Sequence, residues 1–338
     1  MKFGPVPLSQ ALGGILAHSL RMETLTLKKG DVLTQGHIGL LAQAGVAQVV
    51  VAQLEAGDIT ENEAAARVAR AVGGAHVRLD DAFTGRANLF AQCSGVLVAD
   101  PVHVDALNSV DENITLATLP HYRAVVEGEM IATVKVIPFA VPETIVAQAI
   151  ASLPAGALRV APYQAKRIVV ISTLLPGLKP STVDKTLRVM SDRLAQTGAH
   201  VSLDHRVAHE TQALSAAIEQ NVDACDVMIV FGASAITDRR DVIPAALTQA
   251  GGAITQFGMP VDPGNLLLVG EIKGKAFLGA PGCARSPKEN GFDWVLQRLL
   301  ADLPVTAADI RRMGSGGLLM EIVSRPQPRS GGASHAEE

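Results

Sequence analysis

Residues 167–172, RIVVIS, decide the fold of the second half of this chain. Four β-branched apolar side chains in a row are typical of a strand that is buried on both faces, as in a parallel sheet between two layers of helices. Further strands are expected at 199–203, 227–231 and 253–257. Because segments with helical spacing separate these strands, their order predicts a doubly wound, mostly parallel sheet.

The helices that connect these strands are expected at 181–197, 211–220, 242–250 and from about 287 to 300. Ser181 has the N-cap position of the first helix, with Asp184 at the capping-box position. Residues 266–270 and 275–279 flank a short polar turn and predict a β-hairpin. Helices on both faces of one sheet make this a three-layer α/β fold.

The first half of the chain has an α+β pattern, with strands expected at 46–52, 95–99 and 130–139 and a helix at 61–72. Pro154-Ala155-Gly156 indicates a linker. We therefore expect a smaller α+β domain at 1–160, an α/β domain at 161–305 and a C-terminal extension at 306–338. From about residue 325 the extension is rich in Pro, Ser, Gly and charge, and we expect it to be disordered.

The composition of the 338 residues excludes several classes of protein. A hydrophobic fraction of 48% is enough to bury a core. A net charge of −4 and an aromatic fraction of 3% argue against a nucleic-acid partner, which favours a basic face and stacking rings. No apolar run reaches the roughly 18–20 residues of a transmembrane helix, so no membrane is expected. The three cysteines are widely spaced and form no disulfide framework, which indicates a reducing cytoplasm.

Ligands of a doubly wound sheet bind beyond the carboxyl ends of its strands, and residues 232–241 form the first candidate loop there. Small residues let backbone amides approach a ligand, and the helix that follows favours an anion. The candidate ligand-binding residues of this loop are Gly232, Ala233, Ser234, Ala235, Thr237, Arg239 and Arg240. Asp238 and Asp241 are the candidates for a catalytic base or a metal ligand. The alternative is a helix start that Thr237 or Asp238 caps, although two aspartates and two arginines exceed what capping requires.

Two further loops are expected at the same edge, at 261–265 and 279–286. They and the end of the first strand add the candidate ligand-binding residues Thr173, Pro263, Gly264, Asn265, Pro281, Gly282, Cys283, Arg285 and Ser286. Arg285 and Ser286 suit an anion, and Cys283 is a candidate reactive thiol. The alternatives are a plain Pro-Gly turn for the first of these loops and a long helix start for the second.

Two other patterns favour a plain interpretation. Gly232-Ala233-Ser234 resembles a nucleophile elbow, but Ile236 stands where a small residue is needed and the only later histidine is His335. A Ser-His-Asp hydrolase is therefore excluded. Asp204-His205 and His209-Glu210 have a metal-ligand spacing, but they fall in a strand-to-helix connection and are better explained as a solvated loop.

Four motifs of the second half occur in the same order as the motifs of a known family. They are residues 226–234, 240–247, 263–264 and 278–282. They are similar to the Gly-Gly-small loop, the Arg-Asp-Val-Thr-Pro-Glu-Ala continuation, the Lys-Pro-Gly-Lys-Pro turn and the Leu-Pro-Gly-Asn-Pro loop of one family. Residues 166–303 thus resemble the molybdopterin-binding domain that molybdopterin adenylyltransferase and molybdopterin molybdenumtransferase share. In the first half, 29–33 and 38–45 resemble a stretch of the molybdenumtransferase just before that domain. The resemblance implies the three-layer fold of that family and a pterin ligand.

Several positions depart from the family pattern. Ala233 stands where the family has a second glycine, and Asp262 stands where it has the lysine of the turn. The strand end 172–175 lacks the acidic Gly-Asp-Glu-Leu signature of the molybdenumtransferase. Asp241 aligns with the functional aspartate of the family, with Asp238 as a nearby alternative. The resemblance therefore implies a retained ligand pocket with fewer of the acids that metal insertion needs.

The resemblance implies a protein that binds molybdopterin in the biosynthesis or handling of the molybdenum cofactor. The phosphate is then expected at the helix N-termini after Gly232 and Gly282, with Arg239, Arg240 and Arg285 as charge partners. As an enzyme, the protein would insert molybdate or transfer an adenylyl group with Mg²⁺. As a non-catalytic carrier, it would present molybdopterin to a nucleotidyltransferase or a molybdoenzyme. A likeness to competence-damage-type proteins of nucleotide salvage is a third option.

The resemblance also implies a homo-oligomer. Phe231 and Phe257 are the aromatic residues near the expected strand ends. With so few rings to stack on a pterin, recognition is expected to rest on backbone amides and arginine–phosphate contacts.

Overall fold

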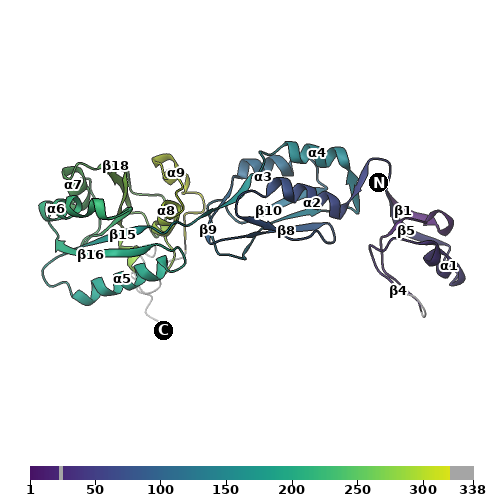
Figure 1. Ribbon diagram of the computed structural model, residues 1–338, viewed down its shortest axis with the longest axis horizontal. Coiled ribbons are helices and arrows are strands. Elements are labelled where there is room, and N and C mark those ends of the chain that lie inside the picture. Colours follow the sequence, from purple (N-terminus) through teal and green to yellow (C-terminus); the bar gives the residue numbers. More distant parts are fainter. Residues whose placement is uncertain (23–25, 320–338) are drawn as a thin grey trace, which may run out of the picture. The chain divides into compact units, whose positions relative to one another are not determined.

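The computed structural model describes residues 1–22 and 26–319, which divide into two compact units. The first unit comprises Met1–Cys93 and Leu97–Val160, and the second comprises Ser94–Val96 and the residues from Ala161 on (Figure 1). The candidate residues of the three loops all lie in the second unit.

The second unit contains a six-stranded sheet of order β16-β15-β17-β20-β19-β18. Its strands are β15 (Arg167–Leu174), β16 (His200–Ala208), β17 (Val227–Phe231), β18 (Ala253–Phe257), β19 (Leu268–Ile272) and β20 (Lys275–Ala280). β16, β15, β17 and β20 run parallel, whereas β19 is antiparallel to both of its neighbours. The mostly parallel sheet and the β19–β20 hairpin confirm the prediction from the sequence.

Helices cover both faces of this sheet because successive side chains of a strand point to opposite sides. Ile168 and Val170 of β15 pack in one apolar cluster with α5 (Pro180–Leu194) and α8 (Gly291–Leu300). Val169 and Ile171 pack in another with α6 (Thr211–Asn221) and α7 (Val242–Gln249). Figure 1 shows α6 and α7 on one side of the sheet and α5 on the other. The predicted three-layer α/β fold is therefore confirmed.

Some boundaries differ from the prediction for identifiable reasons. The first helix begins at Pro180 with Lys179 as its N-cap, since proline suits the first helical position. Asp184 pairs with Arg206 and does not cap the helix. β16 continues to Ala208, so Asp204-His205, expected in a loop, lie on a strand.

The last of the expected helices is shorter than predicted. α8 begins at Gly291, where Asn290 and Asp293 form a capping box, and not near 287. Residues Gly282–Arg285 form only a short 3₁₀-helix, η3, and Val222–Ala224 form another, η2. After α8, the chain continues into α9 (Ala307–Arg312). The disorder expected from about residue 325 lies outside the described residues.

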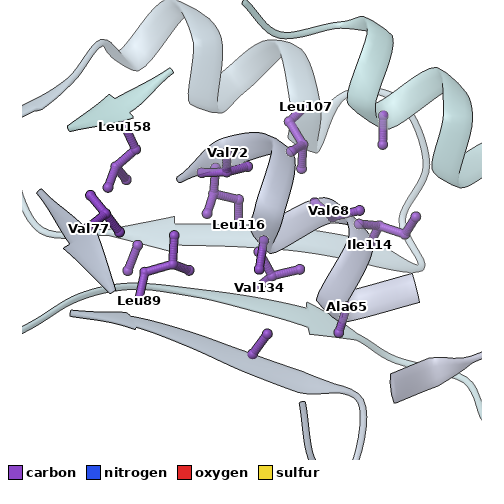
Figure 2. Packing of buried hydrophobic residues seen from close by; sticks show 14 of the residues in the cluster. Ala65, Val68, Val72, Val77, Leu89, Leu107, Ile114, Leu116, Val134 and Leu158 are labelled. Carbon is purple, nitrogen blue, oxygen red and sulfur yellow. The ribbon is translucent and has the colours of Figure 1, made fainter. Parts of the chain in front are cut away.

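The first unit contains an antiparallel sheet of order β10-β12-β8-β7. Its strands are β7 (Val77–Leu79), β8 (Arg86–Ala91), β10 (Ile114–Thr118) and β12 (Met130–Val136). One face packs against α2 (Glu61–Val72), α3 (Pro101–Asn108) and α4 (Glu143–Ala151). Figure 2 shows the side chains of this cluster, with Val68 and Val72 of α2 near Leu116 and Val134 of the sheet. The α+β pattern predicted for this part of the chain is confirmed.

A second apolar cluster of the first unit lies in its amino-terminal residues and includes Leu16, Leu33, Leu41 and Val51. It is built on β1 (Lys2–Pro7), β2 (Ile15–Leu16), β5 (Gln48–Gln53) and α1 (Gln35–Gln43). The remaining short elements are η1 (Leu8–Gln10), β3 (Leu20–Arg21), β4 (Thr26–Leu27), β6 (Asp58–Thr60), β9 (Gly95–Ala99), β11 (Ala124–Val125), β13 (Ala140–Pro142) and β14 (Leu158–Pro162). Over residues 1–22 and 26–319, no helix is both long enough and apolar enough to cross a bilayer.

Truncating the centre of β17 tests this packing. Ile229 is fully buried between the sheet and the α5–α8 layer. We expect Ile229→Ala to lower the free energy of unfolding by about 2–5 kcal/mol because it leaves a cavity. Urea unfolding followed by the fluorescence of Trp294, the single tryptophan, measures the change. The control Leu266→Ala, at a side chain that is 41% exposed, should cost less than about 1 kcal/mol. Equal losses in the two variants would contradict the burial of β17.

Candidate functional site

The topology gathers the candidate loops at one edge of the six-stranded sheet. Phe231 and Ala280 end parallel strands in register, so the loops that follow them start side by side. Because β19 is antiparallel to β20, Leu268 lies opposite Gly279, and residues 258–267 reach the same edge. Residues 232–241, 258–267 and 281–290 therefore meet at the carboxyl ends of the parallel strands, where ligands of such sheets bind.

The carboxylate of Asp241 organises the loop 232–241. Its Oδ2 accepts hydrogen bonds from the amides of Thr237 (2.6 Å) and Asp238 (2.9 Å) and from the Thr237 hydroxyl (3.1 Å). The two backbone donors hold the pKa of the Asp241 carboxyl below its ordinary value, because they stabilise its charged form. One oxygen of this candidate catalytic residue thus has a structural role in its own loop.

Asp238 and Arg240 neutralise each other at the surface. The Nε of Arg240 donates to Oδ1 of Asp238 at 2.7 Å, and the Arg240 amide donates to the same oxygen at 2.8 Å. The guanidinium holds the pKa of the Asp238 carboxyl below its ordinary value. The Arg240 side chain is 91% exposed, so solvent screens the pair and it adds little stability.

Arg239 differs from its neighbour. Its guanidinium carbon lies 5.8 Å from the centroid of the Phe257 ring, a cation–π distance. In the part of the chain that the structure describes, no carboxylate lies within ion-pair distance of Arg239. Its positive charge is therefore uncompensated at the sheet edge.

The backbone amides between Gly232 and Arg239 fall into two groups. The amide of Ala233 donates to the Thr173 hydroxyl at 2.9 Å, and those of Thr237 and Asp238 bond Asp241. Among residues 1–22 and 26–319, no hydrogen-bond partner is seen for the amides of Ser234, Ala235 and Ile236. Three consecutive unsatisfied donors in a loop that carries an uncompensated arginine are suited to an anion.

Arg285 ties the loops together. Its Nη2 donates to the Gly232 carbonyl at 2.9 Å and its Nη1 donates to the Thr186 hydroxyl at 2.8 Å. Its guanidinium carbon lies 5.2 Å from the centroid of the Phe231 ring. The residue expected as a charge partner of a phosphate thus already has three protein partners.

The other residues of the 281–286 loop are mostly buried. Cys283 is buried with its thiol 3.7 Å from Oδ1 of Asn290, which does not suit the reactive thiol that the sequence suggested. Ser286 is also buried, and its hydroxyl accepts from the Lys288 amide at 3.3 Å. Pro281 precedes η3, and Gly282 is exposed.

The helices that follow two of these loops begin at or near the predicted positions. α7 begins at Val242, as predicted, with Asp241 at its N-cap, so a helix N-terminus does follow the loop 232–241. Gly282 opens only the four-residue η3, and α8 begins at Gly291, a few residues later than predicted. The later start follows from the capping box of Asn290 and Asp293.

The Pro-Gly turn braces the loop against α8. The carbonyl of Pro263 accepts from the Gly291 amide at 2.9 Å. Gly264 has a φ of +142°, and a Cβ there would lie 2.8 Å from the Gly291 nitrogen, so the close approach requires glycine. Asn265 is exposed, and its carbonyl accepts from the Met259 amide at 3.0 Å. These contacts favour the plain interpretation of this turn.

The structure adds neighbours that sequence reasoning missed. Nδ1 of His209 lies 2.8 Å from the Thr173 hydroxyl, which also accepts from the Ala233 amide. Ser172 is 1% exposed, and its hydroxyl has no hydrogen-bond partner among the described residues. Nη1 of Arg193 in α5 donates to the Ala284 carbonyl of the 281–290 loop at 2.7 Å. Of His209, Ser172 and Arg193, only His209 belongs to a pattern considered in the sequence, where a solvated loop is the better explanation.

A hollow of about 320 Å³ lies at the opposite edge, where Lys166, Asp226 and Asp302 line it. No group of three or more His, Cys, Asp or Glu side chains that could hold a metal ion occurs within residues 1–22 and 26–319. The candidate site is therefore defined by its donors and its charge.

An α/β domain with three loops at the carboxyl edge of its parallel strands is the class that fold and site define. Residues 167–302 match the family described as a probable molybdopterin binding domain. The second unit thus contains a domain of the molybdopterin-binding family. Residues 5–53 match a family described as a domain of unknown function, DUF8806. No curated protein matches the chain.

Several solved structures are similar at low identity. A molybdopterin biosynthesis moea protein from Pyrococcus horikosii is 14% identical, with 89% of this chain and 75% of that chain covered and a TM-score of 0.33. A molybdenum cofactor biosynthesis protein from Pyrococcus furiosus is 12% identical, with 89% and 64% covered and a TM-score of 0.27. A molybdenum cofactor biosynthesis protein B is 15% identical, with 41% and 96% covered and a TM-score of 0.30.

The structural role of Asp241 can be tested through pH. We expect Asp241→Ala to lower the free energy of unfolding by about 1 kcal/mol at pH 7, because three donors lose their acceptor. The depressed pKa means that this contribution is complete above the unfolded value of about 4 and is lost as pH falls through the folded value. The difference between wild type and variant in urea unfolding should therefore shrink below about pH 4.

Asp223→Ala is the matched control for that measurement. Asp223 pairs only at the surface with Lys273, and its side chain is 79% exposed. Its removal should change stability by less than about 0.5 kcal/mol. A pH-independent loss in Asp241→Ala would show that the carboxylate charge does not hold the loop.

Proposed function

We propose that the second unit binds molybdopterin by its phosphate at the carboxyl edge of the sheet, over the loop 232–241. The observation that carries this proposal is the run of unsatisfied amides at Ser234, Ala235 and Ile236 together with the uncompensated charge of Arg239. The family of residues 167–302 supplies the ligand class. A role in the biosynthesis or handling of the molybdenum cofactor follows from that family.

A single phosphate matches this loop in charge. Consecutive backbone donors can bond an anion, and one arginine adds a charge-assisted bond. The net charge of −4 is compatible with this, because a local cation suffices. Ser234 is exposed and adds a hydroxyl to the donors of the loop.

The two nearby aromatic rings are already covered by cations. Arg285 lies over Phe231 and Arg239 lies over Phe257. This arrangement supports recognition through amides and arginines more than through ring stacking.

The carboxylates favour a carrier over an enzyme. Asp238 pairs with Arg240, and Oδ2 of Asp241 accepts three hydrogen bonds, so both candidate catalytic residues hold their own loop. We infer that the protein presents molybdopterin to a nucleotidyltransferase or a molybdoenzyme. Because such a hand-over needs a second protein, that partner is part of the proposal. We also propose that the protein is a homo-oligomer and that it lies in the cytoplasm.

One observation favours catalysis as a second candidate. Oδ1 of Asp241 has no hydrogen bond among the described residues. Mg²⁺ is commonly held by one or two carboxylates together with the phosphates of a substrate, so this oxygen suits it. Molybdate insertion or adenylyl transfer to molybdopterin are the reactions that such a site would support.

Neighbouring arginines provide a matched test of binding. We expect Arg239→Gln to weaken molybdopterin binding about tenfold, or about 1.4 kcal/mol, because it removes the uncompensated charge. Arg240→Gln should change affinity by less than about twofold, because Asp238 already neutralises that side chain. Anaerobic equilibrium dialysis, with the pterin quantified by fluorescence after acid oxidation, measures both. No binding to the wild-type protein would overturn the proposal.

Turnover assays separate the carrier from the enzyme. Wild-type protein with molybdopterin, Mg²⁺ and either molybdate or ATP is expected to bind the pterin without forming product. Asp241→Asn should then keep both fold and binding, since an amide oxygen still accepts from Thr237 and Asp238. Product formation that Asp241→Asn abolishes would instead establish the transferase.

A further inference from the structure

A buried ion pair contacts the 281–290 loop of the candidate site. Arg193 of α5 and Asp293 of α8 have side chains that are 9% and 10% exposed, and Nε of the arginine lies 2.5 Å from Oδ1 of the aspartate. Burying two charges is costly unless all of their hydrogen-bonding groups are satisfied. The further hydrogen-bond partners of this pair are therefore needed to offset the cost of burying its two charges.

The other donor groups of Arg193 bond carbonyls of one loop, residues 281–290. Its Nη1 donates to the Ala284 carbonyl at 2.7 Å, and its Nη2 donates to the carbonyls of Ser286 and Lys288. A planar guanidinium can reach these alternate carbonyls at once, which an ammonium group cannot do. One side chain thus fixes three peptide groups of the 281–290 loop.

Asp293 secures the other end of that loop. Its Oδ2 accepts from the Asn290 amide at 2.8 Å, and Asn290 caps α8. Nδ2 of Asn290 donates to the Lys288 carbonyl at 3.0 Å. The pair therefore holds the loop from Ala284 to Asn290 against two helices.

Arg285 transmits this order to the ligand loop. Its backbone lies between the carbonyls of Ala284 and Ser286, two of the three that Arg193 bonds, and its side chain bonds the Gly232 carbonyl at 2.9 Å. Gly232 is the first residue of the loop that carries the unsatisfied amides. Asp293 and Arg193 thus fix the backbone on both sides of Arg285, and the Arg285 side chain bonds Gly232.

We propose that Arg193 and Asp293 are positioning residues that preorganise the loop 232–241 for its phosphate ligand through Arg285 and Gly232. This inference rests on the proposed function of that loop. Preorganisation raises affinity because the loop does not lose conformational freedom on binding. Neither residue is part of that loop or bonds it directly.

The test compares Arg193→Lys with Arg188→Lys, an exposed arginine of the same helix, in the full-length protein. Arg193→Lys should weaken molybdopterin binding about tenfold while Arg188→Lys leaves it unchanged. In the unliganded protein, amide hydrogen exchange should speed up in both 281–290 and 232–241 and stay unchanged in α6. Trp294, which donates to Glu289 in the same loop at 2.9 Å, should show lower fluorescence anisotropy.

The outcomes separate this inference from the proposed function. If wild-type protein binds molybdopterin and Arg193→Lys binds it equally well, the positioning role is overturned. If exchange rises only in 281–290, or equally in α6, the pair is merely structural and the inference also fails. If wild-type protein does not bind molybdopterin, the proposed function fails, and exchange in 232–241 alone decides whether the pair orders that loop. Should Arg193→Lys not fold, Asp293→Asn is measured in the same way.

Discussion

The parallel register of β15, β17 and β20, buried on both faces, is the constraint on which the second unit depends. Each parallel strand needs a crossover, and the crossovers form the helix layers that bury its side chains. The same geometry sends the loops after Leu174, Phe231 and Ala280 to one edge. The ligand edge is therefore a consequence of how the apolar runs are buried.

At that edge, most polar groups are used to hold the loops and few remain for a ligand. Asp241 bonds two amides and a hydroxyl, Asp238 pairs with Arg240, and Arg285 bonds the Gly232 carbonyl. Residues that look alike in the sequence, such as Arg239 and Arg240, thereby differ in whether a carboxylate neutralises their charge. These internal bonds leave three amides and one guanidinium without a partner in the protein, and the proposed binding rests on those groups.

The fold was largely predictable from the sequence because its signals are local. The apolar run 167–172 and the helix 61–72, which ends before Gly73, predicted elements that the structure contains. The start of α7 at Val242 was predictable, whereas the start of α8 was not, because Asn290 and Asp293 each had several possible partners. Their capping box places that start at Gly291 and not near 287.

The sequence by itself determined the layers, the loops and the family resemblance, since these depend on spacing along a few neighbouring residues. Only the tertiary structure decided which loop groups are satisfied, because the partners are far apart in the chain. Ala233 meets Thr173 across 60 residues, and Arg193 meets Asp293 across 100. No periodicity records such pairs, since each depends on how two elements pack in space.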